Sequence, residues 1–427
     1  MQIRGFCIIR GLPSYILIRG DYMKALKIII SVTLVALLPL FSLNCAAATI
    51  SSECDISDIA VPISTVTENV PVGTTLDIKA KSAILLEPYS GQILYEMNAD
   101  ELLPPASITK IMSLLLIMEA IDSGALKLED VVTGSAHAAS MGGSQIWLEE
   151  GESMTVDDLL KATVIASAND ATVALAEAIA GSEEGFVALM NERAGKLGMQ
   201  STVFKNATGL DADGHLSTAH DVALMSAALI KFPLIKKYST VWMDTLRDGQ
   251  SELVNTNKLV RFYEGTTGLK TGTTSGAGYC LSATAQRNGM ELVAVIMSGN
   301  TSQDRFEGAK KLLDYGFANF CYTKVTPDLN DVHALPVEDG ESRFVNIEPK
   351  GDFGALLQKS QSQSITQKPV FKENLTAPIK KGKSLGVIEI YSGDTQIGAV
   401  DIVASETVKK MRFSTALLWL LKGLVEI

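Results

Sequence analysis

The sequence has few residues of the types that bind metals or cross-link small folds. Its 427 residues include five cysteines and four histidines. Cys7 and Cys45 lie in an expected leader, and the other three cysteines are widely spaced. This spacing fits neither a disulfide framework nor a zinc site, and the histidines form no HExxH pattern. The sequence therefore predicts no metal centre.

Basic residues are also in short supply. The chain has 37 lysines and arginines against 48 aspartates and glutamates, which gives a net charge of -11. Phosphate binding needs a basic face, so this balance argues against nucleic acid as the main partner. The hydrophobic share of 47% and the charged share of 20% are ordinary for a globular protein. The length suits two domains.

Residues 1–48 are predicted to be a leader that contains a secretory signal peptide. Two lysines follow Met23, an apolar run spans residues 28–43, and Ala46 and Ala48 form a small-residue cleavage site. The stretch before Met23 resembles neither a domain nor a basic n-region, so we expect translation to start at Met23. An uncleaved membrane anchor is the alternative. In both cases the chain is expected to be exported.

A lead-in over residues 49–74 is expected to precede a domain over residues 75–323. Turn signals and apolar segments predict strands at both ends of this domain, and helical periodicity fills its middle. The predicted strands span residues 84–86, 93–95, 278–285 and 291–297. The first and last strands would meet in one antiparallel sheet with helices packed on it, which is an α+β fold.

The remaining chain changes character twice. Short strand candidates separated by turns predict a small all-β domain over residues 324–404. Residues 405–427 are predicted to form an amphipathic helix that associates with a membrane surface, because an apolar face lies opposite a basic edge. A helix packed on the β domain is the alternative. The polar edge consists of Lys409, Arg412, Thr415, Lys422 and Glu426.

The first chemical signal is a serine followed three residues later by a lysine. Ser107 and Lys110 open a strongly apolar helix, so their side chains are expected to lie on one face within reach of each other. A buried lysine pushed towards its neutral form can take the proton of a serine hydroxyl. This pair alone is a weak signal, since a capped helix start with a solvated lysine gives the same pattern.

Two further motifs strengthen the interpretation. Ser167 and Asn169 lie at a break between two helical segments, where their side chains can point into a cleft. Lys270, Thr271 and Gly272 lie at a predicted strand, where the cation can bind a carboxylate or tune Lys110, and the glycine allows close approach of substrate backbone. The order S-x-x-K, S-x-N, K-T-G is the signature of the penicillin-binding and serine β-lactamase group.

On these motifs the chain resembles the D-alanyl-D-alanine carboxypeptidases, which are low-molecular-weight penicillin-binding proteins of the S11 peptidase type. The resemblance extends to "MGGSQIWLEEGESMTVDDLLKATVIASANDA", "NATGLD", "TTGLKTGTTSGAGYCLSATA" and "LLDYGFAN". It covers about residues 75–323 well and the β domain and terminal helix more loosely. The sporulation-type members of Gram-positive bacteria are the expected subgroup.

The resemblance implies a catalytic role for three residues. Ser107 would attack the carbonyl between the two terminal D-alanines of a peptidoglycan stem peptide and become an acyl-ester. Lys110 would be the general base, and Ser167 would relay a proton to the leaving amine. Penicillins would acylate Ser107 as covalent inhibitors. No cofactor and no metal are implied.

The resemblance also implies a substrate-binding set. Asn169 would orient either the substrate or the catalytic lysine. Lys270 and Thr271 would hold the terminal carboxylate, with the neighbouring glycine of the same motif. The backbone N–H groups of Ser107 and Thr273 would form the oxyanion hole.

Family members often carry an extra basic residue near the third motif. Lys258 and Arg261 are the nearest candidates before Lys270. The sequence places neither of them at the site.

Three alternatives stay open. A D,D-transpeptidase or endopeptidase uses the same residues. A class A β-lactamase needs a glutamate on a loop after the second motif, whereas Glu183, Glu184 and Glu192 fall in a helical pattern and Ala168 replaces the motif's usual aspartate. A non-catalytic cell-wall binding protein on the same fold would be credible if the serine or either motif lysine were altered, and all three are present.

Overall fold

The computed structural model describes residues 76–360, 364–417 and 421. The predicted leader, the predicted lead-in and nine of the 23 residues of the last predicted helix lie outside these residues.

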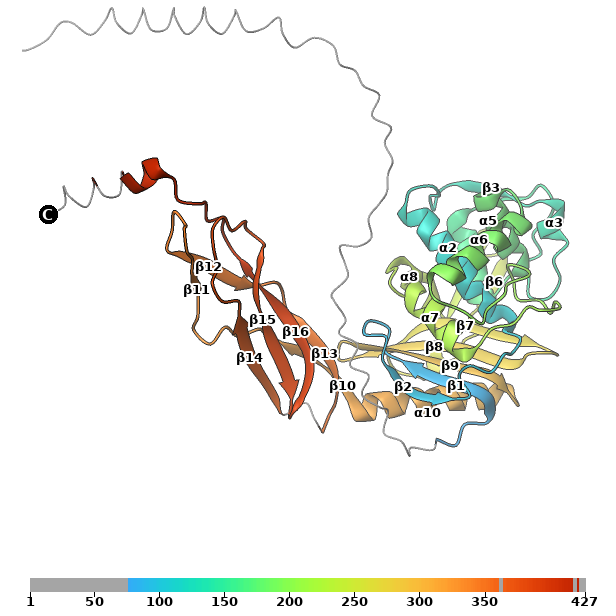
Figure 1. Ribbon diagram of the computed structural model, residues 1–427. Helices are drawn as coiled ribbons and strands as arrows, with labels where there is room; N and C mark the ends of the chain where they lie inside the picture. Colours follow the sequence, from blue (N-terminus) through green and yellow to red (C-terminus); the bar gives the residue numbers. More distant parts are fainter. Residues whose placement is uncertain (1–75, 361–363, 418–420, 422–427) are drawn as a thin grey trace, which may run out of the picture. The chain divides into compact units, whose positions relative to one another are not determined.

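A five-stranded antiparallel sheet forms the centre of the first domain, in the order β2-β1-β9-β8-β7 (Figure 1). The N-terminal hairpin therefore joins three strands from the other end of the domain, as the sequence predicts. In the β1–β9 pairing, Ile84 lies opposite Val295. The strands are β1 (Ala80–Leu86), β2 (Ile93–Met97), β7 (Thr266–Thr274), β8 (Gly278–Arg287) and β9 (Met290–Gly299).

Helices cover both faces of this sheet (Figure 1). Helix α10 (Ser302–Asn319) packs on one face with an apolar cluster that includes Leu292 and Leu312. A larger core lies on the other face, around α2 (Lys110–Asp122), which is apolar nearly all round. The further helices of this layer are α3 (Ala136–Ala139), α4 (Val156–Lys161), α5 (Asn169–Ala180), α6 (Glu183–Lys196), α7 (Ala219–Leu229) and α8 (Leu234–Ser239). The short helix α9 (Leu259–Phe262) instead contributes Leu259 to the apolar cluster of α10.

Local sequence signals fix several of these boundaries. Thr155 Oγ1 accepts a hydrogen bond from Asp158 N and caps α4. Gly181 ends α5 in the left-handed region, and Gly124 follows α2 in the same way. Two small antiparallel sheets of two strands each complete the domain: β3 (Val131–Thr133) with β4 (Ser153–Thr155), and β5 (Met243–Leu246) with β6 (Ser251–Val254).

The second domain is all β. Strand β10 (Phe320–Val325) pairs with β13 (Phe353–Gln358), so the predicted domain boundary at residues 323/324 falls inside a strand. A five-stranded sheet has the order β11-β12-β16-β15-β14 and its own apolar core. Its strands are β11 (Ala334–Pro336), β12 (Phe344–Pro349), β14 (Ile365–Phe371), β15 (Ser384–Ser392) and β16 (Thr395–Ala404).

The last predicted helix begins later than the sequence indicates. Val408 bridges to Ile379 and Lys410 bridges to Gly340, so this segment is extended and belongs to the β domain. The described helical residues are 413–417 and 421. The prediction that Lys409 and Arg412 lie on the polar arc of a helix is therefore wrong, because backbone pairing holds this part of the chain in the domain. No helix among the described residues is long and apolar enough to span a bilayer.

Candidate active site

Ser107 lies in a short 3₁₀ helix, Ala106–Thr109, that leads directly into α2 at Lys110. The sequence predicts a single helix here. In a 3₁₀ turn the side chains of residues three apart eclipse each other, which stacks the serine and the lysine. Lys110 Nζ lies 3.1 Å from Ser107 Oγ.

Lys110 is fully buried, with 0% of its surface exposed. Its Nζ donates to Asn169 Oδ1 at 2.6 Å and to the Thr208 carbonyl at 2.8 Å. Burial, and secondarily the charge of Lys270, hold the pKa of Lys110 well below its ordinary value. A neutral amine has two N–H groups for these two acceptors, and its lone pair is then left for the Ser107 hydroxyl. This arrangement suits a general base.

Ser167 stands where the sequence predicts a helix break. A π-helical turn, Ala162–Ala166, ends at Ser167 in the left-handed conformation with φ of 64°, and α5 starts two residues later. Its side chain is buried, and Oγ has no hydrogen-bond partner in the described part of the chain. A buried hydroxyl without a partner is costly, so this oxygen is available to a bound substrate.

Asn169 holds Lys110 in place. The sequence leaves open whether this side chain orients the substrate or the lysine, and the 2.6 Å contact to Lys110 Nζ indicates the lysine. Its Nδ2 donates to the Gly142 carbonyl at 2.6 Å, and its backbone N–H donates to the Ser144 carbonyl at 2.7 Å. The loop before β4 is thereby fixed to the second motif.

The third motif lies on β7, which is hydrogen-bonded to β8. Lys270 is 1% exposed, and burial, followed by the charge of Arg305, lowers its pKa to about 7. The side chain of Thr271 donates to Thr256 Oγ1 at 2.8 Å. The same strand therefore carries a buried amine and, at the next residue, a hydroxyl.

The structure gives a reason for a glycine at position 272 that differs from the predicted one, which is close approach of substrate backbone. A Cβ on this residue would lie 2.8 Å from Ser107 N and 3.0 Å from both Ile108 N and the Pro105 carbonyl. The glycine thus lets β7 approach the backbone of the nucleophile, in addition to any approach of substrate. The predicted oxyanion hole would draw its two N–H groups, those of Ser107 and Thr273, from these two closely approaching segments.

Arg305 is a residue of this site that the sequence did not indicate. It lies in the first turns of α10, and its Nη1 donates to the Gly272 carbonyl at 3.0 Å and to Thr273 Oγ1 at 2.9 Å. The two candidates from the sequence lie elsewhere: Lys258 caps α9, and Arg261 stacks on aromatic rings. No short-range motif surrounds Arg305, so only the fold brings it to the third motif.

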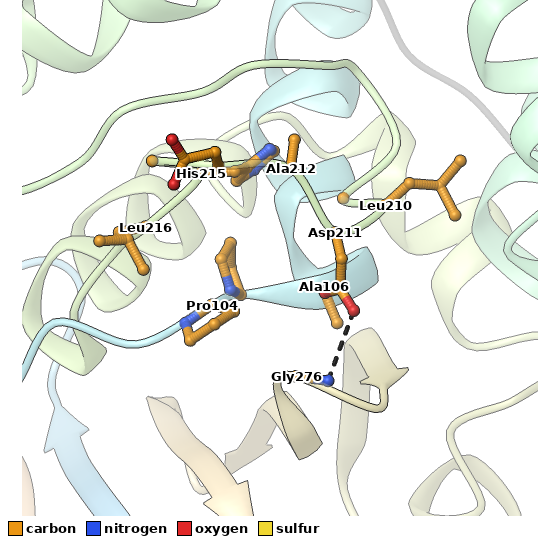
Figure 2. A pocket seen from close by; sticks show the side chains of 12 residues that line it. Pro104, Ala106, Leu210, Asp211, Ala212, His215, Leu216 and Gly276 are labelled. Atoms are coloured by element: carbon orange, nitrogen blue, oxygen red, sulfur yellow. Dashed lines mark hydrogen bonds between the residues drawn. The ribbon is translucent and has the colours of Figure 1, made fainter.

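A hollow of about 470 Å³ lies beside the nucleophile. Figure 2 shows Pro104 and Ala106 on one side of it, the loop 210–216 on another, and Gly276, which donates to Asp211 Oδ2 at 3.4 Å. His215 from this loop contacts Thr109 Oγ1 at 2.9 Å, and burial lowers its pKa to about 4. This histidine is therefore neutral at neutral pH and supports the nucleophile's helix. None of the eight predicted site residues lines the hollow.

Comparisons with known proteins identify the family of the chain. A family model described as D-alanyl-D-alanine carboxypeptidase matches residues 65–301, and one described as the C-terminal domain of penicillin-binding protein 5 matches residues 320–410. The chain belongs to the D-alanyl-D-alanine carboxypeptidase family. The predicted fold class, an α+β penicillin-binding domain followed by a small all-β domain, is thus confirmed.

Relatives in this carboxypeptidase family match most of the chain. D-alanyl-D-alanine carboxypeptidase DacF of Bacillus subtilis (strain 168) is 42% identical over 343 residues, which are 79% of this chain and 88% of the relative. DacC of Escherichia coli (strain K12) is 35% identical, over 79% of this chain and 86% of its own. The solved structure of penicillin-binding protein 5 from Haemophilus influenzae has a TM-score of 0.70 at 30% identity, and covers 79% of this chain and 99% of its own.

Proposed function

We propose that this chain is a serine-type D-Ala-D-Ala carboxypeptidase that removes the terminal D-alanine from peptidoglycan stem pentapeptides. Trimming that residue would limit the peptides available for cross-linking. The observation that carries the proposal is the buried Lys110 amine, held by two fixed acceptors with Ser107 Oγ at 3.1 Å. Membership of the carboxypeptidase family supports the substrate class.

The acylation step follows from this pair. Neutral Lys110 takes the proton of Ser107 as Oγ bonds to the carbonyl carbon between the two D-alanines. The carbonyl oxygen becomes an oxyanion, which the N–H groups of Ser107 and Thr273 stabilise. The C–N bond then breaks, and a proton passes through Ser167 to the leaving amine of D-alanine. An acyl-ester on Ser107 remains.

Deacylation reverses the roles of the proton carriers. Water attacks the ester carbonyl while Lys110 accepts its proton, and Ser107 leaves as the restored hydroxyl. The products are the shortened peptide and free enzyme. If an amine of a second peptide replaces water, the same acyl-enzyme gives a D,D-transpeptidase product, so the residues support both reactions and the assay must separate them.

We assign binding of the substrate's terminal carboxylate to the third motif. Lys270 and Thr271 lie next to each other on β7, and Arg305 adds a second buried cation against Thr273. Two cations in a low-dielectric cleft favour an anionic substrate end. The same binding would place the carboxylate of a β-lactam, which we propose as the class of covalent inhibitor.

A class A β-lactamase activity finds no support here. Glu183, the first of the three glutamates named in the sequence analysis, accepts a hydrogen bond from Ala207 N at 2.9 Å and contacts His137 at 2.7 Å. These contacts tie it to the segment behind α2. A carboxylate held in this way is not offered to a deacylating water.

We further propose that the protein works outside the cytoplasmic membrane, at the membrane surface or in the cell wall. The predicted signal peptide and the peptidoglycan substrate support export. At the C-terminus, Phe413 is 83% exposed, and Leu417 and Leu421 are exposed as well. These apolar side chains on a helical segment suit contact with a lipid surface.

The deciding assay is the release of D-alanine from a pentapeptide that ends in D-Ala-D-Ala. The mature chain should release it, Ser107→Ala should not, and the matched control Ser123→Ala, at an exposed serine, should equal the parent. Penicillin binding without release would indicate a transpeptidase or a sensor. Neither release nor a penicillin adduct would contradict the catalytic function altogether.

A further inference from the structure

Trp147 is an exposed aromatic residue close to the second motif. Its side chain is 76% exposed, whereas its neighbours Ile146 and Leu148 are buried. Its φ of 59° lies in the left-handed region, which residues other than glycine rarely adopt. The chain therefore turns the indole outward at a conformational cost.

A buried aspartate and a partly exposed arginine fix the backbone on both sides of this residue. The carboxylate of Asp170, itself 1% exposed, accepts hydrogen bonds from Ile146 N at 3.0 Å and from Leu148 N at 3.0 Å. Arg247 donates to the Ile146 carbonyl at 2.9 Å and to the Trp147 carbonyl at 3.3 Å. These contacts leave the indole as a preorganised surface, with little entropy to lose when a ligand binds.

The indole forms one wall of a hollow of about 580 Å³. The two carboxylates of Glu149 and Glu150 also line it, and both residues are exposed. The lining residues are Ala139, Ser140, Met141, Gly142, Gln145, Trp147, Leu148, Glu149 and Glu150. None of these nine is basic, so the hollow is negatively charged at neutral pH.

A short series of contacts joins this hollow to the nucleophile. Its rim residue Gly142 accepts from Asn169 at 2.6 Å, Asn169 accepts from Lys110 at 2.6 Å, and Lys110 lies 3.1 Å from Ser107 Oγ. The side-chain amide of Asn169 spans the gap between the first two contacts. Adding its width to the three distances places the Gly142 carbonyl within about 11 Å of Ser107 Oγ.

We propose that this hollow binds the primary ammonium group on the side chain of the residue that precedes the two D-alanines of the substrate. The inference rests on the proposed carboxypeptidase function and names a specificity pocket for it. An indole is the best aromatic partner for a cation, and two carboxylates add charge complementarity.

The reach of such a substrate fits the distance. Successive Cα atoms lie about 3.8 Å apart, and a lysine-like side chain adds about 6 Å. An ammonium group on the residue before the acylated D-alanine can therefore reach about 10 Å from the scissile carbonyl. That span is long enough to reach the rim of the hollow, since the Gly142 carbonyl lies within about 11 Å of Ser107 Oγ.

The test compares two peptides that differ only at the amine: Nα-acetyl-L-lysyl-D-alanyl-D-alanine and its Nα,Nε-diacetyl counterpart. The wild-type chain should cleave the free amine with a kcat/KM about 5- to 30-fold higher. Trp147→Ala should bring this ratio close to 1, while Trp147→Phe should keep part of it. Phe344→Ala, which removes another exposed aromatic ring, should leave the ratio unchanged.

Charge is tested separately. Glu149→Gln combined with Glu150→Gln should lower the ratio and weaken its dependence on salt, and Glu129→Gln should not. Equal wild-type rates for the two peptides would overturn the pocket, because the acetylated peptide still reports the carboxypeptidase. An equal loss on both peptides in Trp147→Ala would also overturn it, since that pattern indicates a structural role. Failure of both peptides with the wild-type chain would contradict the carboxypeptidase itself.

Discussion

Replacement of Gly272 by alanine probes how closely the third motif must approach the nucleophile. The added Cβ would stand 2.8 Å from Ser107 N and 3.0 Å from Ile108 N. Carbon–nitrogen contacts in well-packed interiors are about 3.5 Å, so β7 or the 3₁₀ helix must retreat by about half an ångström. Both atoms are backbone, so no flexible side chain can absorb the change.

The expected loss follows from that displacement. A misplacement of about 1 Å can cost about 100-fold in rate, so Gly272→Ala should slow acylation about 10-fold or more. Overpacking should also lower the free energy of unfolding by about 1–3 kcal/mol. The rate of acylation by a fluorescent penicillin and urea denaturation measure the two effects.

Gly195→Ala is the matched control for this change. Gly195 lies inside α6, where an added Cβ meets nothing within 4 Å. Its replacement should raise the free energy of unfolding by about 0.5–1 kcal/mol and leave acylation unchanged. A Gly272→Ala chain that acylates at the parent rate would refute the argument that the strand's approach sets the oxyanion hole.

The remaining predictions concern the buried charges and the C-terminus. Lys110→Arg should lower D-alanine release by about 100-fold or more, because a guanidinium stays charged and cannot accept the serine proton; release at the parent rate would exclude lysine as the base. The pKa of Lys270 is about 7 in the folded chain against an ordinary value of 10.5. The unfolded chain therefore binds more protons than the folded chain between these two pH values, so the free energy of unfolding should rise with pH in that window. Urea denaturation at pH values near 7 and near 10.5 measures this rise, which should be smaller in Lys270→Met. Asp170→Ala should lower the free energy of unfolding by about 1–3 kcal/mol. It should also speed hydrogen exchange at the backbone amides of Ile146 and Leu148, which donate to this carboxylate, and unchanged exchange would contradict the role of Asp170 in fixing the loop. A chain ending at Met411 keeps the described bridges of the β domain and should no longer sediment with anionic lipid vesicles, whereas undiminished sedimentation would rule out the terminal helix as the anchor.

Local signals in the sequence were sufficient for most of the fold. The Asn288–Gly289 turn, the cap at Thr155 and the terminating Gly181 each act over a few residues, and each sets the end of a helix or strand. The details that differ depend on contacts between distant residues. The extended segment around Val408 pairs with Ile379, which the helical spacing of the surrounding apolar residues could not reveal.

The residues of the site also fall into those that local motifs predict and those that only distant contacts bring together. Ser107, Lys110 and Asn169 were predicted from their motifs, and direct hydrogen bonds join them. The carbonyl of Thr208 and the guanidinium of Arg305 were not predicted, because each reaches the site from a segment without a motif of its own. Their presence follows only from how the helical layer and α10 pack around the sheet.

The most direct test of the central claim is to locate the covalent bond. The mature chain is incubated with benzylpenicillin, digested, and mapped by mass spectrometry, in parallel with Ser107→Ala. We predict one penicilloyl group on the peptide that contains Ser107, and no adduct in the variant. An adduct on a different residue, or an equal adduct in Ser107→Ala, would contradict the account of this serine as the nucleophile.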